Sequence, residues 1–389
     1  MDKQDLVSSL LDGLPARPPS YWDPSARVAY DGAIEAWSVY AFRDVRHVIN
    51  NRAAFSTDYG RSEEQRRQGN LIMGALLGTD GQVHRDLRAA AEGPFQPAAL
   101  ATLRAQARQT ASELLDQVGS RGDRKLEVVA DLATPLPSSM ACSLLGVEIS
   151  AAERMFRWHR EFDNLAGTHE VPAQQDMKQF FEDLINQRRR EPGPGFVNEL
   201  ITMQQAGYTF AGSPLSDYEI AAICAALLSA GTQSVTAGIT NAFLFLTTAG
   251  LWEELALKPS LIPDAVEECL RWYPPFPAAR RLACKDLKLG GRQIRAGQWV
   301  MAWITSANRD PGVFSSPNSF NIRRHPNRHL SFGAGRFHCI GAKLARTEIC
   351  VMIEEAARRF PRLHRDQPCE ISRDLGFNDS VRELPMLTV

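Results

Sequence analysis

No charged side chain occurs from Ile220 to Gly250, and this charge-free stretch limits the possible folds most strongly. Just before it, Ser216 is followed three residues later by Glu219, a capping-box pattern that marks a helix start. The sequence therefore predicts one long helix over about residues 217–249. A helix that is apolar on all sides lies either in a membrane or in a protein core. Its polar interruptions and acidic flanks are untypical of a membrane span, so we expect a large soluble fold built around this helix.

Composition and charge exclude several classes of protein. The 389 residues, of which 44% are hydrophobic, are enough for a large core, and the net charge of -1 gives no basic field for nucleic acid or an anionic membrane. The seven cysteines are an odd number without a Cys-x-x-Cys pair, which argues against a disulfide framework or a structural zinc site. The N-terminus shows no signal-peptide pattern. We expect a cytoplasmic monomer that binds neither nucleic acid nor a membrane.

The remaining pattern predicts a mainly α fold with a minor β region, in a single domain over residues 1–389. Helical periodicity dominates from about Gln96 to Asn241, and a last helix is expected over about Gly341 to Arg359. Strand-like runs occur in the N-terminal part, as at Ala36 to Tyr40, and again over about residues 287–304, where Gly290-Gly291 and Ala296-Gly297 indicate hairpin turns. The minor β subregion should therefore combine the N-terminal part with the second of these stretches.

The most informative segment is the glycine-rich run from His329 to Arg346, which contains Cys339. Cys339 lies just before the predicted final helix, where free backbone N–H groups favour a thiolate over a thiol. Phe332 supplies an apolar wall. The glycines that permit tight turns are Gly333, Gly335 and Gly341, and the nearby cations are Arg336, Lys343 and Arg346. A thiolate in such a loop could act as a nucleophile or as a metal ligand.

Three further interpretations stay open when the loop is considered alone. Gly333-x-Gly335 matches part of a dinucleotide-binding fingerprint, although the third glycine is missing. Cys339 could be a nucleophile paired with a distant histidine, and neither His329 nor His338 decides that point. It could also be an inert cysteine buried at a helix start.

The order Phe332-x-x-Gly335-x-x-x-Cys339-x-Gly341 resembles the haem-binding loop of the cytochrome P450 family, specifically its soluble bacterial members. Other segments resemble the family in the same order along essentially the whole chain. They are Asp80-x-x-x-His84-x-x-x-Arg88, Ala230-Gly231-Thr232-Gln233-Ser234, Glu268-x-x-Arg271, Pro274-Pro275, Arg281-Leu-Ala-Cys-Lys-Asp286, Ala307-Asn308-Arg309-Asp310-Pro311 and Pro317-x-x-Phe320-x-x-x-Arg324.

This resemblance implies haem b as the cofactor, between the long helix and the Cys339 loop, with the thiolate of Cys339 as the axial ligand of the iron. It also implies that Glu268, Arg271 and Arg324 form a structural network. The residues expected to contact the haem or its propionates are His84, Arg88, Arg281, Phe332, Gly333, Arg336, His338 and Gly341. Two residues before the cysteine, family members commonly have His or Arg, whereas this chain has Phe337. Arg336 and His338 are the neighbours that would compensate.

The resemblance assigns oxygen handling to Ala230, Gly231, Gln233 and Ser234 in the long helix. A glycine inside a helix costs about 1 kcal/mol relative to alanine, and a local widening for O₂ or substrate would explain its presence. Ser234 would supply the hydroxyl that the family usually takes from threonine. Gln233 replaces a carboxylic acid and cannot donate a proton as one, so proton delivery would depend on Ser234 with water, or on the substrate. A small-residue packing seam explains Ala230 and Gly231 equally well, but not the Gln-Ser pair.

The function expected from the resemblance is a haem-thiolate monooxygenase that inserts oxygen from O₂ into a small or medium organic molecule, in a natural-product tailoring oxidation. A ferredoxin or flavodoxin with its reductase would supply electrons, and the substrate could be free or bound to a carrier protein. Ring coupling, desaturation and peroxide use are variants of the same chemistry. By the resemblance, the substrate pocket would be lined by residues 65–77, 156–173, 277–279 and 377–380. The alternative class is a haem-binding sensor or carrier without turnover.

Overall fold

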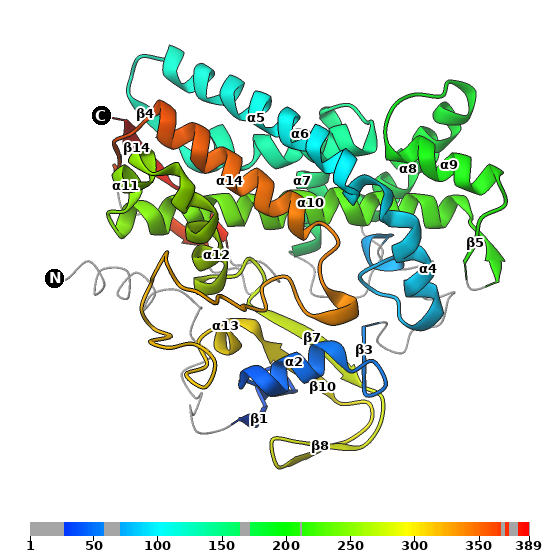
Figure 1. The fold of residues 1–389 in the computed structure, drawn as a ribbon. Helices are drawn as coiled ribbons and strands as arrows, with labels where there is room; N and C mark the ends of the chain where they lie inside the picture. Colours follow the sequence, from blue (N-terminus) through cyan, green and yellow to red (C-terminus); the bar gives the residue numbers. More distant parts are fainter. Residues whose placement is uncertain are drawn as a thin grey trace. The chain divides into compact units, whose positions relative to one another are not determined.

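The computed structural model describes residues 27–57, 71–163, 172–210, 212–366, 370–372 and 380–388. It is mainly helical with small sheets, as the sequence predicts (Figure 1). By its contacts the chain divides into two compact units. Unit 1 comprises residues 1–55, 104–136 and 233–389, and unit 2 comprises residues 56–103 and 137–232. Three helices contain residues of both units: α5 (Pro97–Ser120), α6 (Pro135–Leu145) and α10 (Asp217–Thr248).

The long helix α10 confirms the prediction made from the charge-free stretch. Its first turn carries the capping box, because the backbone N–H of Ser216 donates to the Glu219 carboxylate at 3.1 Å. By length and composition α10 is apolar enough to cross a membrane, but 72% of its most apolar window is buried inside the protein. α10 is therefore a core helix of the fold, and other parts of the protein cover most of its apolar window.

Unit 1 contains a five-stranded sheet with the strand order β1-β2-β10-β7-β3. The strands are β1 (Val28–Asp31), β2 (Ala36–Val39), β10 (Trp299–Trp303), β7 (Ala278–Ala283) and β3 (Phe55–Ser56). β10 pairs in parallel with β2 and antiparallel with β7, so that Val300 lies between Trp37 and Arg281. The face that carries Val39, Val300 and Ala302 is buried in one hydrophobic cluster with residues of α2 (Phe42–Asn50).

The stretch predicted as hairpin strands over residues 287–304 divides between two sheets. β8 (Leu287–Leu289) and β9 (Arg292–Ile294) form the expected hairpin, whose turn places Gly290 and Gly291 at φ of 54° and 81°. The second turn, at Gly297, does not return the chain to β9. It sends β10 into the five-stranded sheet instead, because the alternating apolar residues of β10 find their buried partners on β2 and β7.

Unit 1 also contains further helices and strands, most of them from the C-terminal part of the chain. Its helical elements are η3 (Val129–Ala133), α11 (Trp252–Leu257), η4 (Pro259–Leu261), α12 (Ile262–Trp272), α13 (Ile304–Ala307), η5 (Gly335–Phe337) and α14 (Ala342–Arg359). Its remaining strands are β4 (Lys125–Glu127), β11 (Leu363–Arg365), β12 (Glu370–Ser372), β13 (Ser380–Glu383) and β14 (Pro385–Thr388). β14 lies between β11 and β4 in a three-stranded sheet. α14 matches the predicted last helix within one residue.

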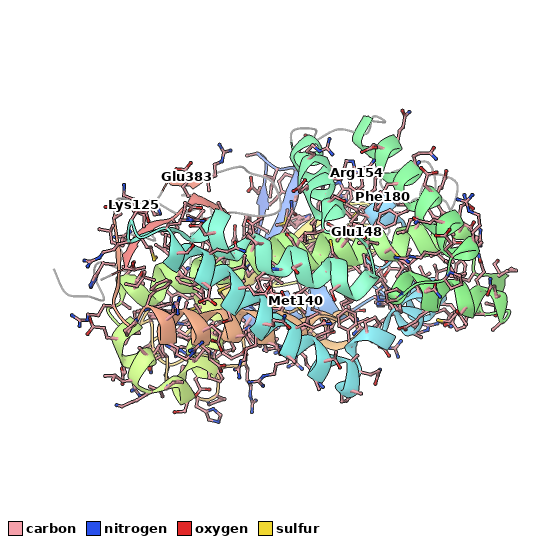
Figure 2. The ribbon with its side chains drawn as sticks, turned by 90° about the horizontal axis from the view of Figure 1, so that it is seen from above. Lys125, Met140, Glu148, Arg154, Phe180 and Glu383 are labelled. Carbon is pink, nitrogen blue, oxygen red and sulfur yellow. The ribbon has the colours of Figure 1, made fainter. Side chains whose placement is uncertain are left out.

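Unit 2 is almost entirely helical. Its elements are η1 (Leu71–Gly74), α4 (Gly81–Ala91), η2 (Gly93–Phe95), most of α6, α7 (Ser150–Asp163), α8 (Pro172–Arg190), α9 (Phe196–Gln205), β5 (Thr209–Phe210) and β6 (Ser213–Pro214). α7 and α8 pack through an aromatic contact in which Arg154 lies 4.9 Å from the ring centre of Phe180 (Figure 2). The indole N–H of Trp158 donates to Asp176 at 2.8 Å and fixes the same pair of helices.

Candidate active site

Cys339 lies in a loop that backbone hydrogen bonds hold in one shape. Its own N–H donates to the carbonyl of Phe332 at 2.8 Å, and its carbonyl accepts from Ala342, the first residue of α14, at 3.3 Å. Within the loop, the N–H of Gly333 donates to Leu330 at 2.8 Å. The cysteine therefore sits directly before a helix N-terminus, as predicted, on a backbone that cannot move without breaking these bonds.

Two of the loop glycines are required by the backbone and one is not. Gly333 and Gly335 have φ of 72° and 58°, in the left-handed region that favours glycine. A side chain on Gly335 would also collide with the carboxamide oxygen of Asn50, at the end of α2. Gly341 has a φ of −84°, which any residue adopts, so the turn between Cys339 and Ala342 does not require glycine at this position. The loop thus depends on close contact with α2.

Cys339 differs from most of the other cysteines in its exposure. Cys142, Cys224 and Cys269 are buried, and burial raises the pKa of Cys142 to about 11 and of Cys350 to about 12, which keeps both as neutral thiols. Of the cysteines that the structure describes, Cys284 and Cys339 are the exposed ones. Within the described residues no group of three His, Cys, Asp or Glu side chains is placed to hold a metal ion. The inert-cysteine interpretation does not fit Cys339.

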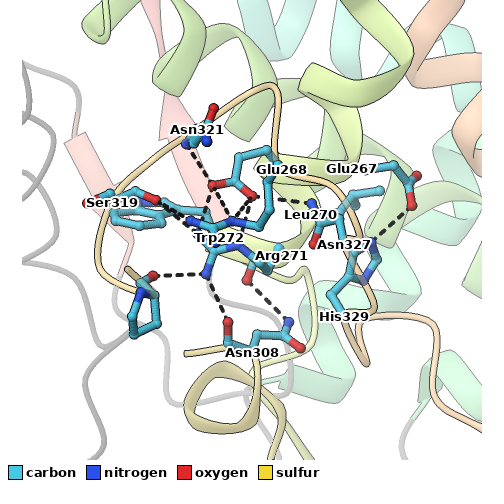
Figure 3. Close-up of polar contacts among 12 residues, drawn as sticks. Glu267, Glu268, Leu270, Arg271, Trp272, Asn308, Ser319, Asn321, Asn327 and His329 are labelled. Carbon is cyan, nitrogen blue, oxygen red and sulfur yellow. Dashed lines mark hydrogen bonds and ion pairs between the residues drawn. The ribbon is translucent and has the colours of Figure 1, made fainter. Parts of the chain in front are cut away.

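A buried ion-pair network joins α12 to the segment that precedes the cysteine loop (Figure 3). Both oxygens of Glu268 accept from Arg271 at 2.8 Å, and neither side chain has any exposed surface. Arg324 donates to the same carboxylate at 3.2 Å. The Glu268 carboxylate also accepts from the backbone N–H of Asn321 at 2.8 Å and from the side-chain amide of Asn327 at 3.2 Å. The arrangement of Glu268, Arg271 and Arg324 expected from the resemblance is therefore present.

Asn308 connects this network to the start of the cysteine loop. Its backbone carbonyl accepts from Arg271 at 2.9 Å, while its side chain accepts from the N–H of Leu330 at 2.8 Å and donates to Ser331 at 3.0 Å. The Ser331 hydroxyl in turn donates to the carbonyl of Leu270 at 2.7 Å. A single buried asparagine thus sets the position of the loop relative to α12.

Glu267 on α12 forms a second clamp that sequence reasoning missed. Its carboxylate accepts from Arg346 of α14 at 2.6 and 2.9 Å and lies 3.2 Å from the ring nitrogen of His329. Burial opposes ionisation of Glu267, but the bonds with His329 and Arg346 outweigh it and lower its pKa to about 2. The Arg346 guanidinium also lies 4.2 Å from the ring centre of Phe332. Arg346 therefore ties the two ends of the loop together.

Phe337 of the cysteine loop contacts two arginines from other segments of the chain. The guanidinium carbon of Arg52 lies 3.7 Å from the ring centre of Phe337, and that of Arg281 lies 5.1 Å from it. Arg336 and His338, which flank Phe337, are exposed. The structure thus brings Arg281, Phe337 and Cys339 into one loop region and adds Arg52, which the sequence gave no reason to choose.

His84 and Arg88 lie one turn apart on α4 in unit 2. His84 is buried, and the side chain of Arg88 is 27% exposed, 3.4 Å from the carboxylate of Glu92. The helix start is fixed by Asp80, which accepts from the hydroxyl of Ser56 at 2.6 Å. The two residues share one helix face, as their spacing predicts.

The segment predicted to handle oxygen is where the burial of α10 is interrupted. Residues 219–229 and 237–246 are buried, whereas Ala230 is exposed and Gly231, Gln233 and Ser234 are partly exposed. A methyl group on Gly231 would meet only Ala141 of α6, at an ordinary contact distance of 3.6 Å. Packing therefore does not require glycine at this position, which weakens the interpretation of Ala230 and Gly231 as a packing seam.

Much of the expected substrate pocket lies outside the described residues. This holds for residues 65–70, 164–171 and 377–379. The backbone N–H of Thr305 donates a hydrogen bond to the carbonyl of Pro277 at 3.1 Å. This part of the predicted lining is therefore anchored to α13.

Comparison with known proteins decides the family. The cytochrome P450 family model matches residues 260–380. A putative cytochrome P450, YjiB of Bacillus subtilis, is 30% identical over 93% of each chain, and the mycinamicin IV hydroxylase/epoxidase of Micromonospora griseorubida is 34% identical over 87% of this chain and 85% of the relative. The chain belongs to the cytochrome P450 family. A solved structure of P450BioI, in complex with a hexadecenoic acid ligated acyl carrier protein, matches the whole of both chains with a TM-score of 0.83 and 27% identity.

As a cytochrome P450, the protein is a monooxygenase whose cofactor is haem b with a cysteine thiolate as axial ligand. The residues present fit that group. Cys339 offers an exposed thiol on a loop with two left-handed glycines, and the guanidinium groups of Arg52 and Arg281 contact Phe337 of the same loop. Bacterial members of the family receive electrons from redox partners.

Proposed function

We propose that Cys339 supplies the axial thiolate and that this cytochrome P450 carries out a tailoring oxidation of a small or medium organic molecule. The observation that carries the proposal is the exposed Cys339 thiol on a backbone fixed by its bond to Phe332 and by the α14 N-terminus. The dipole of α14 favours the thiolate form at this position. Haem bound there would supply O₂ activation, which an electron-rich thiolate ligand favours.

The roles proposed for the protein's own residues follow the resemblance of their motifs to those of the family. The backbone N–H groups near the start of α14 would hold negative charge on the sulfur. Ser234 would hold or pass a proton through its hydroxyl, since it lies where the burial of α10 is interrupted. Gln233 would orient water or substrate by its amide without acting as an acid. His84, Arg88 and Arg281 would bind propionate carboxylates.

The proposed substrate class follows two relatives. One relative acts as a hydroxylase/epoxidase of mycinamicin IV, and one similar structure holds an acyl chain on a carrier protein. We propose a natural-product intermediate as the substrate, free or presented on a carrier. Coupling, desaturation and peroxide use are variants open to the same site, because Gln233 replaces the usual acid.

A separate ferredoxin or flavodoxin, with its reductase, is the proposed electron donor. Arg336 and Lys343 are exposed beside the cysteine loop, where they suit an acidic protein. Arg346 contributes less to such a surface than the sequence suggests, because Glu267 neutralises it. We propose that the enzyme acts as a cytoplasmic monomer.

The decisive experiment is a carbon monoxide difference spectrum of the reduced protein. Thiolate-ligated haem gives a strongly red-shifted Soret band, which we expect in the natural protein and not in Cys339→Ala. Cys284→Ala, which removes the other exposed thiol among the described residues, is the matched control and should keep the band. A red-shifted band that survives in Cys339→Ala would overturn the assignment. Ligand-stimulated consumption of reductant would separate an enzyme from a haem-binding sensor or carrier.

A further inference from the structure

Phe337 occupies a position that leaves the cysteine loop without its usual carboxylate-binding side chain. A phenyl ring has no N–H or O–H group with which to bind a carboxylate. The ring instead packs against the hydrophobic cluster of the five-stranded sheet, together with Ala279 of β7. Two cations, Arg52 and Arg281, also contact the ring, and they indicate what replaces the missing group.

Arg52 reaches the loop from the turn that ends α2. That turn is closed by the backbone N–H of Asn51, which donates to His47 at 2.9 Å, and by Ala54, which donates to Asn51 at 3.1 Å. The guanidinium carbon of Arg52 then lies 3.7 Å from the ring centre of Phe337, a stacking distance. When a guanidinium stacks on a ring through its flat face, its N–H groups point outward in the guanidinium plane. In that plane two of them can bind the two oxygens of a carboxylate.

Arg281 approaches the same ring from the sheet. Arg281 and Ala279 lie on one face of β7, because alternate residues of a strand share a face. Its Nη1 donates to the carbonyl of Arg280 at 2.8 Å, and its guanidinium carbon lies 5.1 Å from the Phe337 ring centre. Three nitrogens of Arg52 and the Nε of Arg281 are buried. Away from bulk water, an ion pair between such a cation and a carboxylate is stronger than at the surface.

We propose that Arg52, held against Phe337 by stacking, supplies the cation that the cysteine loop lacks, and that Arg52 and Arg281 bind one propionate of haem b together. The inference rests on the proposed function, since it needs haem at the Cys339 loop. Phe337 then acts as the platform that positions Arg52. The carboxylate-binding charge has moved from the loop to the end of α2, about 285 residues earlier in the chain.

The test measures how fast the ferric holoprotein loses haem to an excess of apomyoglobin. Arg52→Gln should accelerate haem loss by about ten-fold or more, the size expected for one charge-assisted hydrogen bond. Arg46→Gln removes a charge from an exposed position on α2 and is the matched control, which should lose haem at the natural rate. Equal rates for Arg52→Gln and Arg46→Gln would overturn the proposal.

A modified haem separates carboxylate binding from packing. In haem dimethyl ester both propionates are esterified, so the natural protein and Arg52→Gln should lose it at equal rates. If Arg52→Gln loses the ester faster than the natural protein by the same factor as haem, Arg52 acts only by packing on Phe337, and the proposal is wrong. Introducing Phe337→His into Arg52→Gln should restore haem retention, because the imidazole returns a carboxylate partner to the loop.

The failure of this inference can be distinguished from the failure of the proposed function. If the natural protein shows no red-shifted carbon monoxide band, Cys339 is not the ligand and the proposed function fails. A natural protein that keeps this band, with Arg52→Gln unchanged in haem loss, would remove only the role of Arg52.

Discussion

Glu268 and Arg271 form a two-pronged ion pair at 2.8 Å in which neither side chain reaches solvent. Arg271 also donates to the carbonyls of Asn308 at 2.9 Å and Pro317 at 3.0 Å, so the pair joins α12 to the long irregular segment before the cysteine loop. Removing one partner would leave a buried charge uncompensated. We therefore expect the pair to act as a structural support and to take no part in the chemistry.

The first prediction concerns this pair. Glu268→Gln should lower the free energy of unfolding by about 3–5 kcal/mol, because Arg271 and Arg324 would both lose their counter-charge. The neighbouring pair Arg323–Glu254 is the control: both side chains are partly exposed, and Arg323→Gln should cost less than about 1 kcal/mol. Urea unfolding of the purified proteins measures both. Equal losses in the two variants would contradict the structural role of Glu268.

The second prediction concerns acid stability through Glu267, whose pKa is about 2 in the folded protein against 4.5 ordinarily. Between these values the unfolded chain binds a proton that the folded chain does not. The stabilisation is therefore complete above about pH 4.5 and is lost as the pH falls towards 2, with a size on the order of 3 kcal/mol. Glu267→Gln should flatten the stability curve over that interval. Parallel curves for the variant and the natural protein would disprove the clamp.

The third prediction concerns Glu348, a carboxyl group of α14 that is buried and whose pKa burial raises to about 8. Below pH 4.5 both states of the chain are protonated. Between about pH 4.5 and 8 the unfolded chain ionises first, so the free energy of unfolding falls as the pH rises. Glu348→Gln, which stays neutral, should gain stability over the natural protein across this interval. Thermal unfolding at pH 5, 6.5 and 8 measures the difference, and a difference independent of pH would contradict the raised pKa.

The fourth prediction concerns Ser234 on α10. Ser234→Ala should raise the consumption of reductant per molecule of product, because the hydroxyl proposed to hold a proton is lost. Ser234→Thr restores a hydroxyl and should keep the coupling near its natural value. Thr236→Val, two residues further along α10, is the control for a lost hydroxyl on the same helix. Unchanged coupling in Ser234→Ala would remove Ser234 from proton delivery.

Local sequence patterns were enough for α10, for α14 and for the cysteine loop. The charge-free stretch and the capping box at Ser216 predicted α10, and the glycines before Cys339 predicted the loop at the start of α14. Such features depend on residues within a few turns of each other, so a single chain segment contains the whole signal.

The contacts that sequence missed join distant segments. Nothing near Arg52 indicates that it stacks on Phe337, and Glu267 is one glutamate among many until α14 brings Arg346 to it. The partner of β10 was likewise misjudged, because the adjacent β9 was the nearer candidate and the parallel pairing with β2 arises only from burial of a shared face. Periodicity predicts elements, but it does not predict which elements meet.

The parallel pairing of β2 with β10 also determines when the protein can complete its fold during synthesis. Val39 pairs with Ala302, so about 260 residues must leave the ribosome after β2 before this strand gains its second neighbour. At roughly 5–20 residues per second, this interval lasts on the order of half a minute. Throughout it, the β1–β2 hairpin presents an open strand edge of the kind that recruits other chains. A chaperone that shields the nascent N-terminal hairpin should therefore raise the yield of haem-loaded enzyme.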